Sequence, residues 1–168
     1  MRFLIVLVSS LFVSAASAET CKAGDFSVYA GRQEVQTDKI ETAPLYGASM
    51  NFGNQCFPVW GVHLSFGAKL AVEHSVGEDL TTTTVGAGPS WCFQFATGTG
   101  LCAAYLVRDS QFKTDEAKAN YGSQGAEYGV TQTFGSVVGK AAYSMADYKT
   151  GEDNVKLKSY TLGLGYAL

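Results

Sequence analysis

The sequence predicts an all-β protein, a single eight-stranded antiparallel up-and-down transmembrane β-barrel. Large apolar side chains alternate with small or polar ones along several segments, which is the two-residue period of a β-strand. Glycine-rich turn signals separate these segments, and no stretch shows sustained helical periodicity. The apolar row consists of large side chains, and the opposite row consists of small ones. That distribution fits a barrel with lipid outside and a narrow interior.

The first 18 residues are predicted to be a secretory signal peptide. A basic start and an apolar run over residues 3–13 precede the small residues 16–18, which suit a cleavage position. A buried N-terminal helix is the less favoured alternative. Cleavage after residue 18 leaves residues 19–168, which is the length of one domain.

Charge and hydropathy limit the partners. Loss of Arg2 with the leader leaves 11 basic and 15 acidic residues, a net charge of −4, which argues against general nucleic-acid binding. No apolar run after residue 18 is long enough for a membrane helix. A membrane location would therefore require a closed barrel, because closure satisfies every strand edge in lipid.

The segment 155–168 shows the alternation most clearly. Its apolar row consists of Tyr160, Leu162, Leu164, Tyr166 and Leu168, and the row between them is small or weakly polar. A soluble barrel would normally place charges on its water-facing row. This segment therefore fits a strand with its apolar row in lipid.

Seven further strands are expected. They cover residues 25–33, 45–52, 60–73, 81–95, 101–108, 127–134 and 137–147. Trp60 opens the apolar row of the third, and Pro89 in the fourth removes a ladder donor and predicts a bulge. The two-residue turn Gly135-Ser136 sets Phe134 opposite Val137 and keeps the apolar faces together.

The connections fall into two kinds. Those over residues 53–59, 96–100 and 135–136 carry no charge, whereas the connections after strands one, three, five and seven are acidic and basic, with 109–126 the longest. Short turns at one end and long charged loops at the other are typical of bacterial outer-membrane barrels. An aromatic belt is predicted near the short turns. Its members are Trp60, Trp91, Phe93, Phe95, Phe134 and Tyr166.

The whole pattern resembles the small eight-stranded bacterial outer-membrane β-barrel superfamily, the OmpA-transmembrane-domain and OmpX-like proteins. Tyr160, Leu162, Leu164 and Tyr166 are similar to the C-terminal signature that the barrel-assembly machinery reads in this family. Leu168 departs from it, because the family usually ends in Phe or Trp. The resemblance implies location in the bacterial cell outer membrane, with outer-membrane lipid, lipopolysaccharide and the assembly machinery as partners.

The four cysteines are expected to pair in the oxidising periplasm. Cys92 and Cys102 are equidistant from Thr97, so a hairpin centred there sets them opposite each other on the inward face. Cys21 and Cys56 fall near the short-turn end, and their bridge is expected to lie outside the barrel. A zinc site of four cysteines is the alternative, but the closely spaced pairs that zinc favours are absent.

Several charged or polar residues fall on the predicted inward rows. They are His63, Ser65, Lys69, Glu73, Arg108, Glu127 and Lys140. The favoured interpretation is a hydrogen-bonded and ion-paired plug, because lumen charges must be paired. The alternative is a hydrolytic triad like that of outer-membrane lipid A deacylases. His63 and Ser65 match the start of that motif, but Phe66 replaces its Asn and both side chains would face the lumen.

The sequence therefore favours a small outer-membrane protein with a structural or surface-interaction role, without catalytic residues, cofactor or metal. A surface ligand would be reached through the loop 109–126. A lipid A-modifying acyl hydrolase of the same architecture is the second hypothesis. A soluble secreted ligand-binding barrel ranks third, because it needs an apolar lumen.

Overall fold

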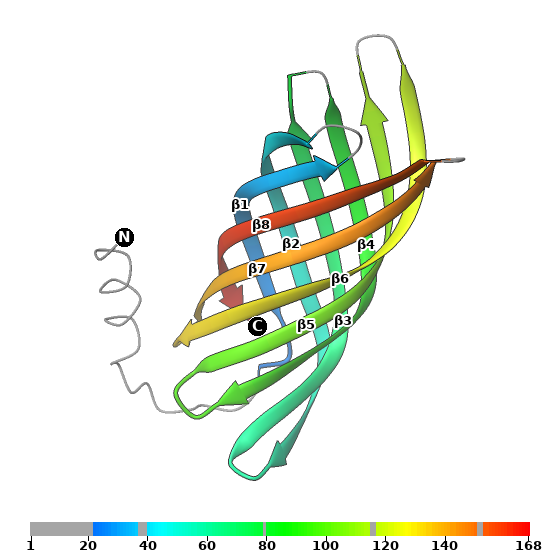
Figure 1. Ribbon diagram of the computed structural model, residues 1–168. Helices are drawn as coiled ribbons and strands as arrows, with labels where there is room; N and C mark the ends of the chain where they lie inside the picture. The colour runs from blue at the N-terminus through cyan, green and yellow to red at the C-terminus, as the bar shows by residue number, and fades with distance from the viewer. Residues whose placement is uncertain (1–21, 37–39, 79, 115–116, 151–152) are drawn as a thin grey trace.

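The computed structural model describes residues 22–168 except 37–39, 79, 115–116 and 151–152, and it forms one closed antiparallel barrel (Figure 1). The predicted signal peptide, residues 1–18, lies outside the described residues. The strands are β1 Asp25–Gln36, β2 Ile40–Val59, β3 Val62–Val76, β4 Thr81–Phe95, β5 Thr99–Lys113, β6 Lys118–Phe134, β7 Val137–Thr150 and β8 Asp153–Ala167. Each strand pairs with its sequence neighbours, and β1 pairs with β8 to close the ring.

The predicted hairpin register between β6 and β7 is confirmed. Phe134 pairs with Val137 and Tyr128 with Tyr143, across the two-residue turn in which Gly135 has a φ of 61°. A short turn of this kind fixes the register of the strands that it joins.

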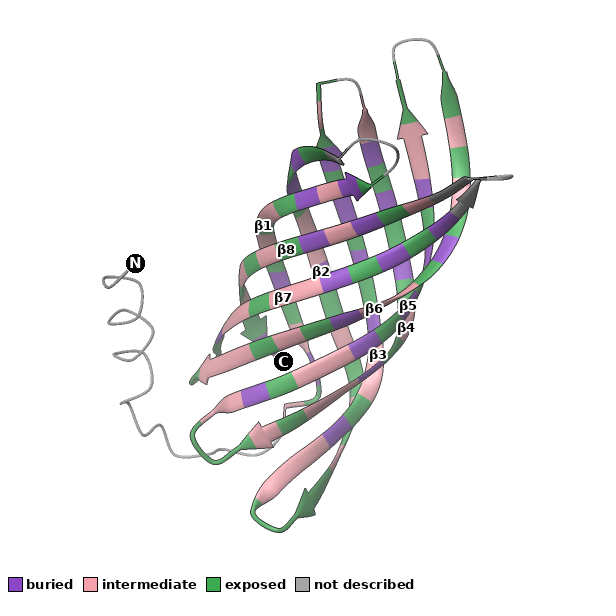
Figure 2. Cartoon of the chain, in the orientation of Figure 1, coloured by how far each residue is buried: buried purple, intermediate pink, exposed green. Residues whose placement is uncertain are grey.

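The facing of the strands also follows the prediction. In β8, Leu162 is 72% exposed and Leu164 is 65% exposed, whereas Ser159, on the opposite face of the same strand, is 3% exposed. Exposed and buried bands alternate along the other strands as well (Figure 2). The large apolar residues thus form the outer wall, and the small and polar residues line the interior.

The predicted connection over residues 53–59 is wrong, because β2 continues through it to Val59. The turn is formed by Trp60 and Gly61, with φ values of 48° and 81°. Trp60 is therefore not part of the outer row of β3, and its side chain is fully exposed at the tip of the hairpin.

A β-bulge explains why the two-residue period did not identify the end of β2 as part of a strand. Phe52 pairs with Ala68 and Gln55 with Phe66, so two residues of β2 stand opposite one residue of β3. Gly53 adopts a φ of 67°, which favours glycine. The extra residue reverses which face the remaining residues of β2 point to. Even-numbered residues point outward before the bulge and inward after it.

The loop predicted over residues 109–126 is also wrong. The strand β5 runs to Lys113 and β6 starts at Lys118, with these two lysines paired. The outward positions in this part of β5 include Asp109 and Gln111, which are polar. The apolar alternation that identifies a strand in the sequence therefore ends before β5 itself ends. For the same reason β1 and β6 are longer than the sequence predicts.

The bulge predicted at Pro89 is absent. Ala87 pairs with Val107 and Ser90 with Ala104, so the register is the same on both sides of the proline. Gly88 and Pro89 have no registered partner in β5. The missing N–H of proline removes ladder bonds at this point, but it inserts no residue.

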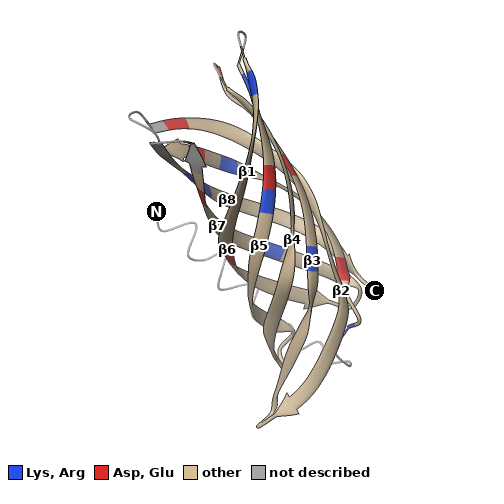
Figure 3. Ribbon diagram, turned by 90° about the vertical axis from the view of Figure 1, so that its right-hand side faces the viewer, with Lys and Arg blue, Asp and Glu red and all other residues tan. Residues whose placement is uncertain are grey.

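Charged residues concentrate toward the end of the barrel with the extended hairpins, whereas the β2–β3 hairpin at the opposite end has none (Figure 3). In the part of the chain that the structure describes, no helix is long and apolar enough to cross a membrane.

Candidate functional site: the barrel interior

The inward rows of four strands bring buried charges together in the middle of the barrel. Lys69 and Glu73 come from β3, Arg108 from β5, Glu127 from β6 and Lys140 from β7. The first four are each less than 8% exposed. Charges removed from water to this extent need partners, because an isolated buried ion is costly.

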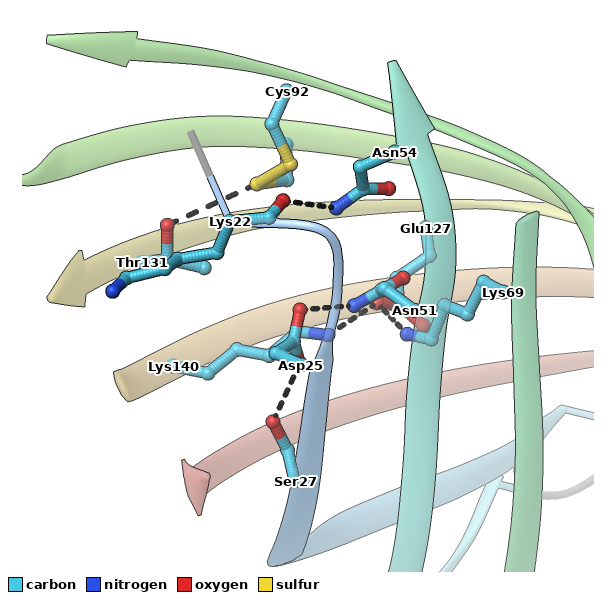
Figure 4. The surroundings of a disulfide bond; sticks show 11 residues. Lys22, Asp25, Ser27, Asn51, Asn54, Lys69, Cys92, Glu127, Thr131 and Lys140 are labelled. Carbon is cyan, nitrogen blue, oxygen red and sulfur yellow. Dashed lines mark hydrogen bonds and ion pairs between the residues drawn. A yellow bond between two sulfur atoms is a disulfide. The ribbon is translucent and has the colours of Figure 1, made fainter. Parts of the chain in front are cut away.

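Glu127 is the centre of this group. Its Oε1 accepts a hydrogen bond from Lys69 Nζ and lies 3.7 Å from Lys140 Nζ (Figure 4). The side chains of Glu127 and Lys140 are each 9% exposed, and that of Lys69 is 3% exposed. One carboxylate thus bridges two ammonium groups from opposite strands and links β3, β6 and β7 across the lumen.

Glu73 has a different partner. The Tyr29 hydroxyl donates to Glu73 Oε1 at 3.1 Å and ties β1 to β3. Sequence reasoning missed Tyr29, because aromatic residues were read mainly as members of the outer row. Its position could have revealed it, since it alternates with Val28 and Ala30 and so falls on the inward face.

Arg108 is buried but incompletely bonded. Its Nη1 donates to the Met145 main-chain carbonyl at 3.4 Å, whereas Nη2 has no hydrogen-bond partner in the structure. Gly125 makes room for the guanidinium, because a Cβ at that position would lie 2.5 Å from Nη1. The guanidinium therefore fills the lumen between β5 and β7.

Toward the charged-loop end, the interior changes from ionic to hydroxyl groups and then to apolar ones. Ser110 Oγ lies 2.6 Å from both Thr84 Oγ1 and the Tyr148 hydroxyl. Above them lies an apolar cluster, which was not predicted. Its buried members are Val35, Ala146, Tyr148 and Leu157, with Leu80, Phe112, Tyr121 and Val155 packed against them. The plug is therefore polar in the middle and apolar at this end.

The disulfide Cys92–Cys102 forms at the opposite end, between β4 and β5, as the hairpin register predicts. The two residues are directly paired, and Cys102 Sγ lies 3.9 Å from Thr131 Oγ1 (Figure 4). This covalent link joins the two strands on the lumen side.

The predicted position of Cys56, in a connection outside the barrel, is wrong. It lies in β2 opposite Ser65, which in turn pairs with Cys92. The prediction of a bridge outside the barrel assumed an unbroken alternation in β2, and the bulge at Gly53 turns Cys56 to the inward row. Cys21 lies outside the described residues, so its pairing with Cys56 stays a prediction.

The segment before β1 crosses this end of the lumen. Asn54 donates its main-chain N–H to the Ala23 carbonyl at 3.1 Å and its side-chain amide to the Lys22 carbonyl at 3.4 Å. Asp25 then accepts hydrogen bonds from Asn51 at 2.7 Å and Ser27 at 2.9 Å (Figure 4). The side chain of Asn54, carried inward by the bulge, thus holds the N-terminal segment in place.

The geometry does not assemble a hydrolytic triad. Ten residues of one extended strand separate His63 from Glu73, a distance of roughly 33 Å. Glu73 is bonded to Tyr29, and in the described part of the chain no hydrogen bond joins His63 to Ser65. His63 is half-buried near the short-turn end, away from the charged centre. Among the described residues no group of three or more metal-binding side chains converges either.

Two small spaces lie inside the barrel among the described residues. One of about 50 Å³ lies between Lys22, Asn54 and the disulfide, and one of about 10 Å³ lies beside Tyr29, Lys69 and Glu127. A space of the second size holds about one water molecule. Around these described residues the interior is therefore filled with side chains and leaves no room for a sizeable ligand.

A closed eight-stranded antiparallel barrel with a packed interior and an apolar outer wall is the architecture of the small outer-membrane barrels. Comparison with solved structures confirms the predicted fold class. The chain is similar to Neisserial surface protein A, with a TM-score of 0.65, 12% identity, and coverage of 89% of this chain and 100% of that one.

Two further structures share the fold. Ail, the attachment invasion locus protein of Yersinia pestis, gives a TM-score of 0.55 at 13% identity, covering 88% of this chain and 100% of its own. The outer membrane protein OprG of Pseudomonas aeruginosa gives 0.52 at 13% identity, covering 88% and 97%. No family model and no curated protein matches the sequence.

Proposed function

We propose that the protein is an integral barrel of the bacterial outer membrane with a structural or surface-interaction role, and that it neither catalyses a reaction nor forms a pore. The observation that carries this proposal is the inverted distribution of polarity. Val107, Leu162 and Leu164 are more than 60% exposed on the outer wall, while Lys69, Arg108 and Glu127 are buried inside. Such a molecule is stable where its outer wall meets hydrocarbon.

The proposed role includes export and assembly. Residues 1–18 direct the chain to the periplasm, and residues 19–168 form the barrel. The outward row Tyr160, Leu162, Leu164, Tyr166 and Leu168 of the last strand is presented to the barrel-assembly machinery. Outer-membrane lipid and lipopolysaccharide surround the wall. An external ligand would bind to the extended β5–β6 hairpin, which occupies the place of the predicted loop 109–126.

The acyl hydrolase hypothesis has less support. Its nucleophile would be Ser65, which is only 6% exposed and belongs to the inward row, where an acyl chain in the bilayer cannot reach it. Comparing the acylation of lipid A in cells with and without the gene tests this alternative directly. Unchanged lipid A is the expected result.

Membrane extraction tests the proposed location. The protein is expected to stay with the outer-membrane fraction through high salt and alkaline carbonate and to be released by detergent. Unheated samples of the extracted protein are expected to migrate faster on a denaturing gel than boiled ones, because the closed barrel is more compact. Release by carbonate alone would contradict the outer-membrane proposal.

A further inference from the structure

The outer wall is hollowed on one side. An open groove of about 750 Å³ crosses β5, β6, β7, β8 and β1, and its lining is almost wholly apolar. This volume lies within the roughly 300–1,000 Å³ typical of small-molecule sites. A row of registered outward residues crosses it in the order Leu101, Val130, Ala141, Leu162 and Ala30. The groove exists because alanines occupy two of these positions beside larger neighbours.

An amphipathic row borders the groove on the side of the charged loops. It consists of Tyr128, Tyr143, Tyr160 and Arg32, which are registered partners across β6, β7, β8 and β1. The rings of Tyr143 and Tyr160 lie 5.0 Å apart. Tyrosines gather at the level where hydrocarbon meets headgroups. This border therefore marks the interface, with the groove on its hydrocarbon side.

Arg32 is the cation at this border. It is exposed on the outward row of β1, and its registered partners Pro44 and Tyr160 carry no charge. The nearest outward carboxylate on the strand, Glu34, is opposite Lys158. Among the described residues Arg32 forms no ion pair. A guanidinium at a membrane interface without a protein partner is free to bind an anion from the leaflet.

We propose that this groove binds one phosphorylated acyl lipid of the outer leaflet, with an acyl chain over Ala141 and Ala30 and a phosphate on Arg32. The inference rests on the proposed membrane location. The apolar floor selects hydrocarbon, and the planar guanidinium suits the paired oxygens of a phosphate. The tyrosine hydroxyls lie at the depth of the headgroup. The occupant is a lipid, because free phosphate would make no use of the groove.

Native mass spectrometry of the folded protein in detergent micelles tests the site, with bisphosphorylated lipid A as the probe. Arg32→Gln is expected to weaken lipid A binding about tenfold, the loss of one charge-assisted contact. Ala141→Phe fills the groove and is expected to weaken binding to a similar extent. The matched controls Lys113→Gln and Ala87→Phe change an exposed charge at the end of β5 and an outward alanine of β4, both away from the groove. Both are expected to bind as the wild type does.

Dephosphorylated lipid A separates the two parts of the site. Its binding is expected to respond to Ala141→Phe and not to Arg32→Gln. Equal affinities for Arg32→Gln and Lys113→Gln, or for Ala141→Phe and Ala87→Phe, would overturn the inference. So would inorganic phosphate alone competing with lipid A at equal concentration. A barrel that folds in micelles and resists carbonate extraction but fails these tests would refute the lipid site and leave the proposed function standing.

Discussion

At the scale of single residues, the interior depends on one carboxylate. Glu127 faces two ammonium groups, Lys69 and Lys140, which come from β3 and β7. Both cations would be left in a water-poor interior if this carboxylate were neutralised. A buried ion pair adds little beyond an apolar packing of the same volume, but breaking one is costly because the remaining charge is unpaired.

Glu127→Gln is therefore expected to lower the free energy of unfolding by about 3–5 kcal/mol. Urea unfolding of the barrel in lipid vesicles, followed by gel mobility, measures the loss. The control is Asp109→Asn, which neutralises an exposed carboxylate on β5 and should change stability by less than about 0.5 kcal/mol. Equal losses for the two variants would mean that the interior is wet enough to solvate both lysines.

At the scale of strands, the outer row of β8 holds the residues that would meet lipid in the proposed membrane location. Leu164 is 65% exposed and lies three residues before the end of β8, whereas Leu168 ends the same row beyond the last residue of the strand. The energetic cost of a charge on the lipid face depends on its depth, and it falls toward the interface.

Leu164→Asp is expected to destabilise the protein in bilayers by about 1–3 kcal/mol, and Leu168→Asp by at most about 1 kcal/mol. Unfolding titrations of both variants in the same vesicles give the comparison. If Leu168→Asp were as costly as Leu164→Asp, the depth assigned to the row would be wrong.

The bulge in β2 is a second feature at this scale. Gly53 has a φ of 67°, and a Cβ built on it would meet no atom within 4 Å. Any cost of a side chain at this position would therefore come from the backbone conformation and not from a clash.

Gly53→Val is expected to cost about 1–3 kcal/mol through backbone strain. Gly139→Val is the control, because Gly139 lies in β7 with an ordinary φ and a Cβ there would lie 3.8 Å from its nearest neighbour, the Gln132 carbonyl. Unfolding in urea should separate the two. Equal stability would indicate that the bulge relaxes without a positive φ.

Strand rules predicted the parts of the molecule in which one face is uniformly apolar. The segment 155–168 and the hairpin at Gly135 follow the two-residue period, so their facing and register were readable. The bulge was not, because Gly53 and Asn54 add one residue without any change in composition. Nor were the ends of β5 and β6, since Asp109 and Gln111 break the apolar row where the strand continues. Tyr29 belongs to the plug through a hydrogen bond with β3, a contact distant in sequence.

At the scale of the whole molecule, three layers of side chains fill the barrel. The disulfide and the segment before β1 lie at one end, the ionic centre in the middle, and the apolar cluster of Val35, Tyr148 and Leu157 at the other. Eight strands enclose a space just wide enough for such side chains, whereas aqueous channels need roughly sixteen.

Purified, folded protein is therefore expected to show no stable conductance in planar bilayers. A sixteen-stranded porin reconstituted in the same way is the positive control. Steady openings of nanosiemens size would contradict the filled lumen, whereas brief small currents would reflect local opening of side chains.

The seam between β1 and β8 has a consequence for the order of events in folding. Asp25 pairs with Ala167, and Leu168 exchanges main-chain hydrogen bonds with Ala23 and Gly24. These contacts join the first and last strands, so the ring cannot close before β8 is in place. Until β8 arrives, the unfinished sheet has two open edges, which attract other chains. A chain of this topology therefore needs its open edges shielded until β8 closes the ring.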